Sequence, residues 1–193
     1  MKLLFATANQ NKAKEIAALL PASYELLTLR DIDLKEDIPE TQNTLEGNAK
    51  QKSEYVLNNF QLDCFADDTG LEIPALNNEP GVLSARYAGE QRDSEANMQL
   101  VLDRLKGKDD RSARFRTVIS LELNGKQYLF EGIVNGTIRE GKSGDGGFGY
   151  DPIFEPENCG RTFGEMTMDE KNQYSHRARA FEKMINFLSE MAE

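Results

Sequence analysis

Short apolar runs and helix-spaced apolar positions alternate along the first 30 residues. KLLFA (2–6) predicts a buried strand. The apolar residues of the next segment recur at helical spacing up to Pro21, which ends a helix. YELLTL (24–29) predicts a second strand. A strand, a helix and a strand in this order are typical of α/β folds.

The middle of the chain continues this alternation. An irregular acidic stretch (31–43) precedes a predicted helix that carries Leu45, Ala49, Lys52 and Val56 on one stripe. LDCFA (62–66) predicts a strand that runs into ADDTG (66–70), and LEIPAL (71–76) a further extended segment. Residues 93–106 carry apolar positions at helical spacing, with Asp93 as the expected N-cap and Gly107 as the stop.

The second half contains the clearest hairpin pattern. Residues 113–123 and 126–138 both alternate apolar and polar positions, and the dipeptide Asn124-Gly125 joins them. A last helix is expected from Ser175, with Ala178, Phe181, Ile185 and Leu188 facing inward. About six strands and four helices predict a single α/β domain over residues 1–193, with a mixed β-sheet flanked by helices.

Charge and composition exclude several classes of function. The net charge of −10 argues against a nucleic-acid partner, although a local basic pocket could still bind a small anion. No run of 18 apolar residues predicts a membrane span, and no export signal is recognised, so we expect a cytoplasmic location. Cys64 and Cys159 lack the spacing of a metal site, and Cys64 is expected to be a small core residue.

TANQNK (7–12) follows the first strand and opens the first helix. A helix start presents N–H groups and the positive end of the dipole, which suits a phosphate. Thr7, Asn9 and Lys12 add a hydroxyl, an amide and a charge. The alternative is a polar turn capped by Asn11.

ADDTG (66–70) places two carboxylates at the end of a buried strand. Adjacent strand residues point to opposite faces, so only one of the two aspartates can face a given site. One Asp, with Glu40 from the preceding loop, offers the one or two carboxylates that Mg²⁺ takes besides substrate phosphates. The alternative is an Asp-rich turn with Gly70 at its tip.

EKNQYSHRARA (170–180) places cations at the start of the last helix. Ser175 can cap this helix, while His176 and Arg177 fall in its first turn, where the dipole disfavours positive charge. Breaking a local rule suggests a binding role. Lys171, one loop earlier, could add a charge. The alternative for His176 is a solvated side chain at a helix end.

GDGGFGYDP (144–152) combines four glycines with two aromatic residues. This composition suits close backbone approach to a flat ligand, with Phe148 as the stacking face; a turn anchored by aromatics is the alternative. Arg86, in GVLSARYAGE (81–90), either reaches a phosphate or belongs to a surface loop packed by Tyr87. Together these segments describe a nucleotide site.

The chain resembles the Ham1-like or RdgB-like nucleoside triphosphate pyrophosphatases, also called ITPases or dITP/XTP pyrophosphatases. The resemblance runs in order through TANQNK, PET with EGNAKQK, FADDTGLEI, PGVLSARYAGE, GGFGYDPIF and EKNQYSHRARA. It implies an elongated α/β domain with a long mixed sheet and two lobes around a cleft. It also implies a homodimer that hydrolyses ITP, dITP and XTP to the monophosphate and pyrophosphate, and so cleanses the nucleotide pool.

The resemblance also assigns roles to residues. Asp68 matches the catalytic position, and Glu40 and Asp68 match the site for Mg²⁺ or Mn²⁺. Ala8 stands where the family often has Gly or Ser, and its small size keeps close approach possible. The implied substrate contacts are Thr7, Ala8, Asn9, Gln10, Asn11, Lys12, Thr69, Phe148, Gly149, Tyr150, Asp151, Lys171, His176 and Arg177.

Two alternative functions stay open at this point. A Maf-like pyrophosphatase would act on modified or pyrimidine nucleotides, which a panel of ITP, XTP, GTP, dTTP and UTP would reveal. A non-catalytic nucleotide-binding module would release no pyrophosphate with magnesium.

Overall fold

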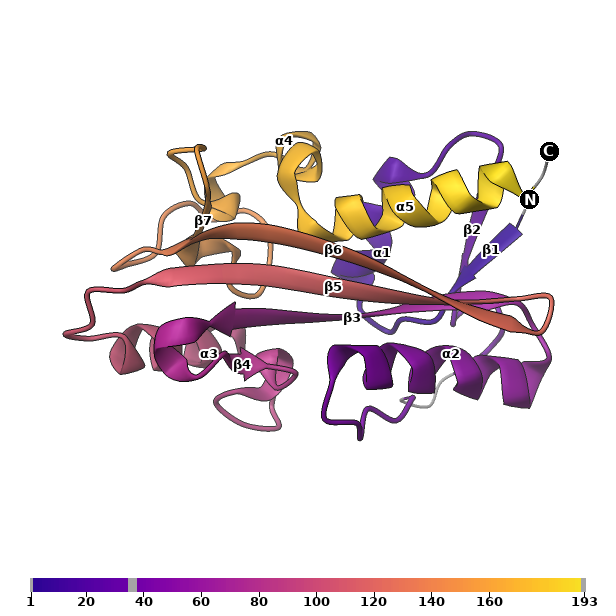
Figure 1. Ribbon diagram of the computed structural model, residues 1–193, viewed down its shortest axis with the longest axis horizontal. Helices are drawn as coiled ribbons and strands as arrows, with labels where there is room; N and C mark the ends of the chain where they lie inside the picture. The colour runs from indigo at the N-terminus through magenta and orange to yellow at the C-terminus, as the bar shows by residue number, and fades with distance from the viewer. Residues whose placement is uncertain (1, 35–37, 192–193) are drawn as a thin grey trace. The chain divides into compact units, whose positions relative to one another are not determined.

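A computed structural model describes residues 2–34 and 38–191 (Figure 1). Its strands are β1 (Lys2–Phe5), β2 (Glu25–Thr28), β3 (Cys64–Ile73), β4 (Glu79–Gly81), β5 (Ser112–Leu123), β6 (Lys126–Ile138) and β7 (Phe154–Pro156). Its α-helices are α1 (Gln10–Leu19), α2 (Leu45–Phe60), α3 (Ser94–Arg104), α4 (Met168–Tyr174) and α5 (His176–Glu190). Four 3₁₀ turns occur at Pro74–Leu76, Ser84–Arg86, Asp151–Ile153 and Phe163–Glu165.

The strands form one mixed β-sheet, as the sequence predicts. Their order is β2-β1-β3-β5-β6-β7, and β4 pairs with β3. Strand β1 is parallel to both β2 and β3, whereas β4 and β7 are antiparallel to their neighbours β3 and β6. The α/β fold with a mixed sheet is therefore confirmed.

The chain divides into two units. Unit 1 comprises Met1–Asp68, Thr117–Gly132 and Arg177–Glu193, and unit 2 comprises Thr69–Arg116 and Ile133–His176. The boundary falls inside β3, β5 and β6, so each of these strands contributes to both units.

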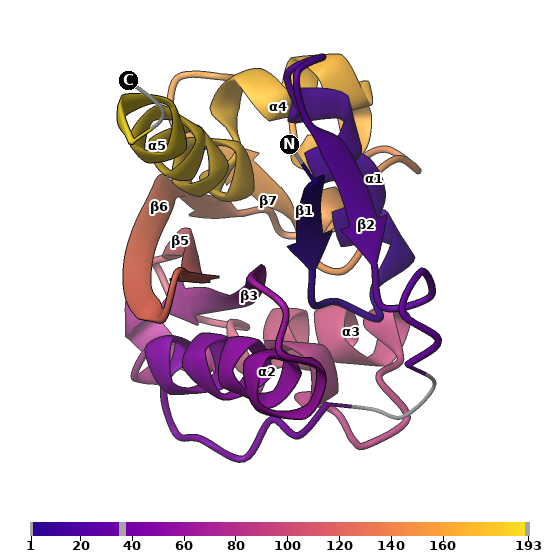
Figure 2. The same ribbon diagram turned by 90° about the vertical axis from the view of Figure 1, so that its right-hand side faces the viewer.

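Unit 1 has an apolar core on each face of its strands. Helices α1 and α5 pack on one face, where Ile16 and Phe181 meet Phe5 and Phe65. The rings of Phe5 and Phe65 stack with 4.5 Å between their centroids. Helix α2 packs on the other face through Val56. Figure 2 shows α2 and α5 on opposite sides of the strands.

The predicted stripe of α2 is confirmed, because Leu45, Ala49, Lys52 and Val56 are all buried. Thr44 caps the helix by accepting a hydrogen bond from the N–H of Gly47. A buried lysine on an otherwise apolar stripe needs a partner, because an unpaired buried charge is costly. The site described below supplies this partner.

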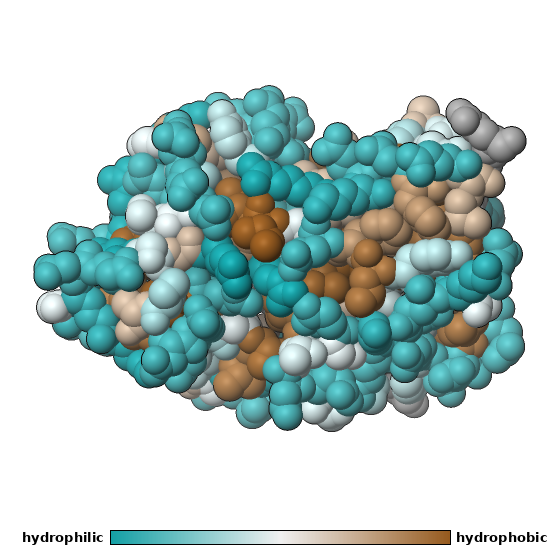
Figure 3. Space-filling view, viewed as in Figure 1, coloured by the Kyte–Doolittle hydropathy of each residue, from teal (hydrophilic) through white to brown (hydrophobic). Residues whose placement is uncertain are grey.

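The predicted hairpin is formed by β5 and β6. Asn124 and Gly125 have φ of 51° and 71°, the positive values that a two-residue hairpin turn of this type requires. In Figure 3, apolar surface lies over the region where Figure 1 places α5 and β6. The partly buried hydrophobic residues of these two elements in unit 1 are Tyr128, Phe130, Ile185 and Phe187.

Unit 2 has its own core. Helix α3 contributes Met98 and Val101, and its C-cap Leu105 joins them; all three pack with residues of β5, β6 and the chain after β6. Asp93 is the N-cap of α3, as predicted, and accepts hydrogen bonds from the N–H groups of Glu95 and Ala96. The helix ends at Arg104, slightly before the predicted stop at Gly107.

Three expectations about the elements were wrong. The strand does not end at ADDTG, because β3 continues through Gly70 to Ile73, and the alternative of an Asp-rich turn is excluded for the same reason. An added Cβ at Gly70 would lie 2.6 Å from the carbonyl oxygen of Gly81 on β4. Lys171 lies in helix α4 and not in a loop. The described residues form seven strands and five α-helices, more than predicted, because three-residue strands and the seven-residue α4 are too short for periodicity to reveal.

No helix among the described residues is long and apolar enough to cross a membrane.

Candidate active site

The loop after β1 ends in a capped helix start. Asn9 is the N-cap of α1, and its side-chain oxygen accepts hydrogen bonds from the N–H groups of Asn11 (2.9 Å) and Lys12 (3.3 Å). The cap is therefore Asn9 and not Asn11, the alternative considered from the sequence. Thr7 is buried, and its hydroxyl oxygen accepts from the N–H of Asn9 at 3.2 Å. The other predicted residues of this loop, Ala8 and Gln10, are exposed.

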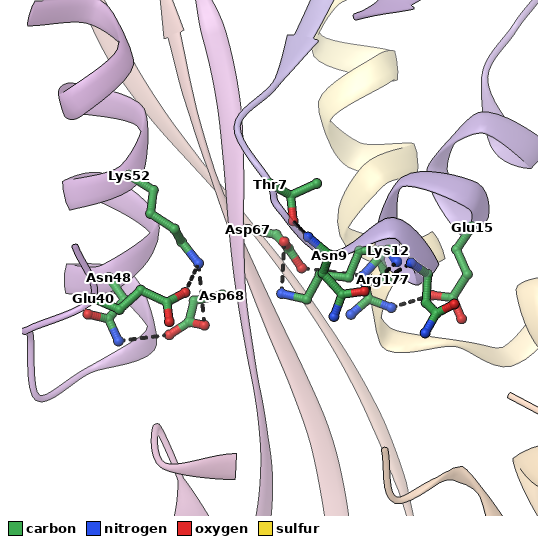
Figure 4. A network of polar contacts seen from close by, with 11 residues as sticks. Thr7, Asn9, Lys12, Glu15, Glu40, Asn48, Lys52, Asp67, Asp68 and Arg177 are labelled. Atoms are coloured by element: carbon green, nitrogen blue, oxygen red, sulfur yellow. Dashed lines mark hydrogen bonds and ion pairs between the residues drawn. The ribbon is translucent and has the colours of Figure 1, made fainter. Parts of the chain in front are cut away.

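Strand β3 directs its two aspartates to opposite faces, as its pleat requires (Figure 4). Asp67 lies on the same face of β3 as Phe65, and this face packs with α1 and α5. Asp68 lies on the same face as Cys64 and Ala66, and that face packs with α2. Both side chains are buried. Adjacent residues of the same type therefore belong to two different clusters, both within unit 1.

Asp68 lies in a cluster built by α2 and the loop before it. The side-chain N–H of Asn48 donates to Oδ2 of Asp68 at 3.1 Å, and Oδ1 of Asp68 lies 3.7 Å from the Lys52 Nζ. Lys52 Nζ also donates to Glu40 at 2.6 Å. Asn48 in turn accepts from the backbone N–H of Gln42, which ties the loop of Glu40 to the helix.

Asp67 lies in a second cluster built by α1 and α5. Its Oδ1 accepts from Lys12 Nζ at 2.9 Å, and its Oδ2 accepts from Arg177 Nε at 3.3 Å. Arg177 also pairs with Glu15 of α1. All four side chains are at most 14% exposed. These contacts explain how the positive charge of Arg177 is tolerated in the first turn of α5, because two carboxylates offset the unfavourable dipole.

The two aspartates differ in their ionisation. Burial raises the pKa of Asp68, and the positive charges of Lys52 and Lys12 only partly oppose this effect. Burial acts on Asp67 in the same direction, but the charges of Lys12, Arg177 and Lys52 outweigh it and hold the pKa of Asp67 below its ordinary value. Environments that separate the pKa values of neighbouring carboxylates are typical of acid–base sites. Asp68 is the better proton acceptor of the two.

The Asp68 cluster also suits a divalent cation. Glu40 and Asp68 both direct an oxygen at the same ammonium group of Lys52, so the two carboxylates converge on one position of positive charge. Within residues 2–34 and 38–191, no three carboxylate, thiol or imidazole side chains form a complete metal cage. Mg²⁺ needs no such cage, since it takes one or two carboxylates and completes its shell with water and phosphate oxygens. The donor set fits a metal that arrives with its substrate.

Unit 2 contains the glycine-rich loop, and Asp151 organises it. Buried Asp151 accepts from the backbone N–H of Phe148 at 2.8 Å and from Lys171 Nζ at 2.6 Å. Lys171 Nζ also lies over the Phe148 ring, 4.7 Å from its centroid. Gly147 has a φ of 72°, and a Cβ there would lie 2.2 Å from Oδ2 of Asp151. The glycine thus makes room for the carboxylate that holds Phe148 and Lys171 together.

The aromatic residues near this loop have different surroundings. Phe148 is half-buried, whereas Tyr150 is buried and donates its hydroxyl to the carbonyl of Ser84 at 2.7 Å. Tyr150 is therefore a core anchor. His176 is 2% exposed and stacks on Phe115 with 4.6 Å between ring centroids, so it is not the solvated residue considered as the alternative.

The remaining predicted residues occupy simpler positions. Thr69 follows Asp68 on β3 and is half-buried, and Gly149 has a φ of 62° with no atom within 4 Å of an added Cβ. The Nη1 atom of Arg86 lies 3.9 Å from Oε2 of Glu90. Tyr87 packs against the core of unit 2 and donates its hydroxyl to Glu79, in line with the packed-loop interpretation.

Sequence reasoning missed Lys52, Asn48 and Glu15 as parts of these clusters. Lys52 carried a usable signal, because a lysine on the apolar stripe of α2 breaks the local pattern just as His176 and Arg177 do. Asn48 carried no such signal in the sequence, since a polar residue at the edge of an apolar helix stripe is common. Glu15 falls among exposed polar positions of α1, and only the tertiary structure reveals its burial.

Comparison with known proteins adds independent information. The model of the Ham1 family matches residues 3–187. A dITP/XTP pyrophosphatase of Flavobacterium johnsoniae is 53% identical over 98% of both chains. One of Bacillus subtilis is 44% identical over 96% of both chains. The structure of the Staphylococcus aureus Ham1 protein superposes with a TM-score of 0.89 at 38% identity, covering 99% of this chain and 100% of that one.

Proposed function

Since the chain belongs to the Ham1 family, we propose that it hydrolyses non-standard purine nucleoside triphosphates (ITP, dITP and XTP) to the monophosphate and pyrophosphate. The observation that carries this proposal is the convergence of Glu40, Asp68 and Lys52, supported by Asn48, in a chain so similar to dITP/XTP pyrophosphatases. Removal of such nucleotides cleanses the pool from which nucleic acids are made.

Asp68 acts as the general base in the proposed reaction. It takes a proton from water while the water oxygen bonds to the α-phosphorus. The bond from that phosphorus to the oxygen bridging the α- and β-phosphates breaks, and pyrophosphate leaves with the bonding electrons. Asn48 holds Oδ2 of Asp68, which leaves Oδ1 as the oxygen that faces the cationic position. A raised pKa makes Asp68 a stronger base than an ordinary carboxylate.

Glu40 and Asp68 would hold the divalent metal, which we propose to be Mg²⁺, with Mn²⁺ as a substitute. A bound metal supplies charge that stabilises the phosphate oxygens as the transition state forms. Lys52, already paired with both carboxylates, keeps them directed at one position before substrate arrives. Lys12 contacts the departing pyrophosphate. The same subsite is lined by Thr7, Asn9 and the backbone of residues 8, 10 and 11.

The loop of unit 2 contacts the base. Phe148 offers a stacking face, and Lys171 or His176 supplies a donor for O6 of hypoxanthine or xanthine. Adenine carries an amino group at this position, so the donor would be left without an acceptor, which costs about 1–3 kcal/mol. The other predicted contacts, Thr69, Gly149, Tyr150, Asp151 and Arg177, position these groups or the ligand.

The substitution Asp68→Asn tests the assignment of the base. It preserves the shape of the side chain but removes its ability to take a proton, so pyrophosphate release from ITP should fall by about 100-fold or more. Circular dichroism should show an unchanged fold. Full activity in this variant would rule out Asp68 as the base.

We also propose that the chain forms a homodimer that acts in the cytoplasm, where nucleoside triphosphates are made and used. The homodimer is what the family resemblance implies. Sedimentation should give a single species of about twice 21.7 kDa, and a species of the monomer mass at working concentration would contradict the dimer.

A further inference from the structure

The structure points to a role for Asp67, the aspartate that faces away from the proposed metal. We propose that Asp67 is a positioning residue: it holds Lys12 in the place from which it contacts the phosphates of the substrate, and buried Arg177 anchors the other oxygen of Asp67. This inference rests on the proposed function, because it deepens the account of the same phosphate subsite.

The first support is the distribution of contacts on the carboxylate. Each oxygen of Asp67 accepts from a different cation, Lys12 on Oδ1 at 2.9 Å and Arg177 on Oδ2 at 3.3 Å. Lys12 belongs to α1 and Arg177 to α5, so a single side chain of the central strand ties both helices to one point (Figure 4). Two such contacts fix the direction of both cations.

The second support is burial. The Asp67 side chain is 1% exposed, and a carboxylate so deeply buried needs hydrogen-bonded cations to be tolerated. The Lys12 side chain is 14% exposed, so its ammonium group is held from inside while part of the side chain still reaches the surface. This arrangement suits a lysine that receives an anion from solvent without losing its anchor.

The third support is the balance of charge. Glu15 and Asp67 carry two negative charges, and Lys12 and Arg177 carry two positive charges. The cations are therefore stable before the substrate binds and need no large rearrangement when phosphates arrive. Preorganised donors of this kind lower the cost of binding.

The pleat of β3 separates this role from that of Asp68. Asp67 lies on the face of α1 and α5, and Asp68 lies on the face of α2. Loss of Asp67 should therefore weaken substrate binding, whereas loss of Asp68 should slow the chemical step. The same substitution at two adjacent positions provides a matched comparison.

The test measures ITP hydrolysis and its competitive inhibition by inorganic pyrophosphate in the wild type, Asp67→Asn and Asp68→Asn. We expect Asp67→Asn to raise both the KM for ITP and the Ki of pyrophosphate by about tenfold and to change kcat by less than about threefold. Asp68→Asn should differ from Asp67→Asn in the chemical step, with kcat itself lowered by about 100-fold.

The outcomes separate the possible errors. A fall in kcat at unchanged KM and Ki in Asp67→Asn would overturn the positioning role. A purely structural role would also leave KM unchanged, because a misfolded fraction lowers the apparent kcat alone. If the wild type itself released no pyrophosphate from ITP, the proposed function would fail, independently of Asp67.

A second variant covers the case in which Asp67→Asn does not fold. Asp67→Asn combined with Lys12→Met removes a negative and a positive charge together and leaves the pair of Glu15 and Arg177. Relative to Lys12→Met alone, the double variant should change the kcat for ITP by less than about threefold. A further loss of about 100-fold in kcat would place Asp67 in the chemical step and overturn the inference.

Discussion

At the scale of single residues, environment decides which of two neighbouring aspartates does which task. Asp67 and Asp68 are chemically identical, yet the cations of α1 and α5 hold the pKa of Asp67 down, whereas burial raises the pKa of Asp68. Sequence reasoning reached Asp68 through the family resemblance, and the strand period required the two to face apart. The identity of their partners depends on tertiary packing.

Asn48 should be necessary for the orientation of Asp68. The substitution Asn48→Ala removes the hydrogen bond to Oδ2 of Asp68 and the one from Gln42, and we expect kcat for ITP to fall by about tenfold or more. Gln51→Ala is the matched control, because Gln51 ties the same loop through Thr41 but does not contact Asp68 in the described hydrogen bonds. Equal decreases of kcat in the two variants would mean that catalysis depends on the anchoring of the loop and not on the hydrogen bond to Asp68.

Cys64 should make stability depend on pH in the alkaline range. Burial, with the nearby charges of Glu122 and Asp63, raises the pKa of this thiol from 9.0 to about 12. The unfolded thiol ionises first, so the stabilisation is complete below pH 9 and is lost as pH rises toward 12.

The variant Cys64→Ala isolates this contribution. Between pH 8 and pH 10, the free energy of unfolding should fall by about 1 kcal/mol more in the wild type than in Cys64→Ala, as urea denaturation can measure. Parallel pH profiles of the two proteins would show that the thiol ionises equally easily in the folded state.

At the scale of elements, the long periodic segments were predictable and the short ones were not. The stripe of α2, the N-cap Asp93 and the hairpin turn at Asn124-Gly125 follow from local rules, and all three are confirmed. Strand β3 was expected to break at its aspartates, because Asp and Gly favour turns. The strand nevertheless continues to Ile73, and its last residues pair with β4, where Leu71 and Ile73 lie opposite Gly81 and Glu79.

The glycine-rich loop should depend on Gly147 for a steric reason. The substitution Gly147→Ala strains a backbone at φ of 72° and pushes a Cβ to within 2.2 Å of the Asp151 carboxylate. Displaced Asp151 would release Phe148 and Lys171, so the KM for ITP should rise by about tenfold.

Gly107→Ala provides the control for backbone strain. Gly107 has a φ of 73°, and no atom lies within 4 Å of an added Cβ. This variant should lose about 1 kcal/mol of stability at unchanged KM. The same KM in both variants would show that the contact with Asp151 does not shape the site.

At the scale of the whole molecule, each of the two units holds a chemically distinct set of residues. Unit 1 holds the carboxylates and most of the cations proposed for phosphate and metal, and unit 2 holds the aromatic loop proposed for the base. The division of the chain into these units was not predictable from local patterns, because the boundary falls inside three continuous strands. Although the net charge is −10, Lys12 and Lys52 place positive charge in two clusters that are largely buried.

The most direct test of the central claim is the release of pyrophosphate from ITP and from ATP, at equal concentrations, with Mg²⁺ and after its removal by a chelator. The account predicts rapid release of pyrophosphate and IMP from ITP, at least about tenfold slower release from ATP, and no release from either without the metal. Equal rates for the two nucleotides, release of orthophosphate in place of pyrophosphate, or undiminished activity after chelation would contradict it.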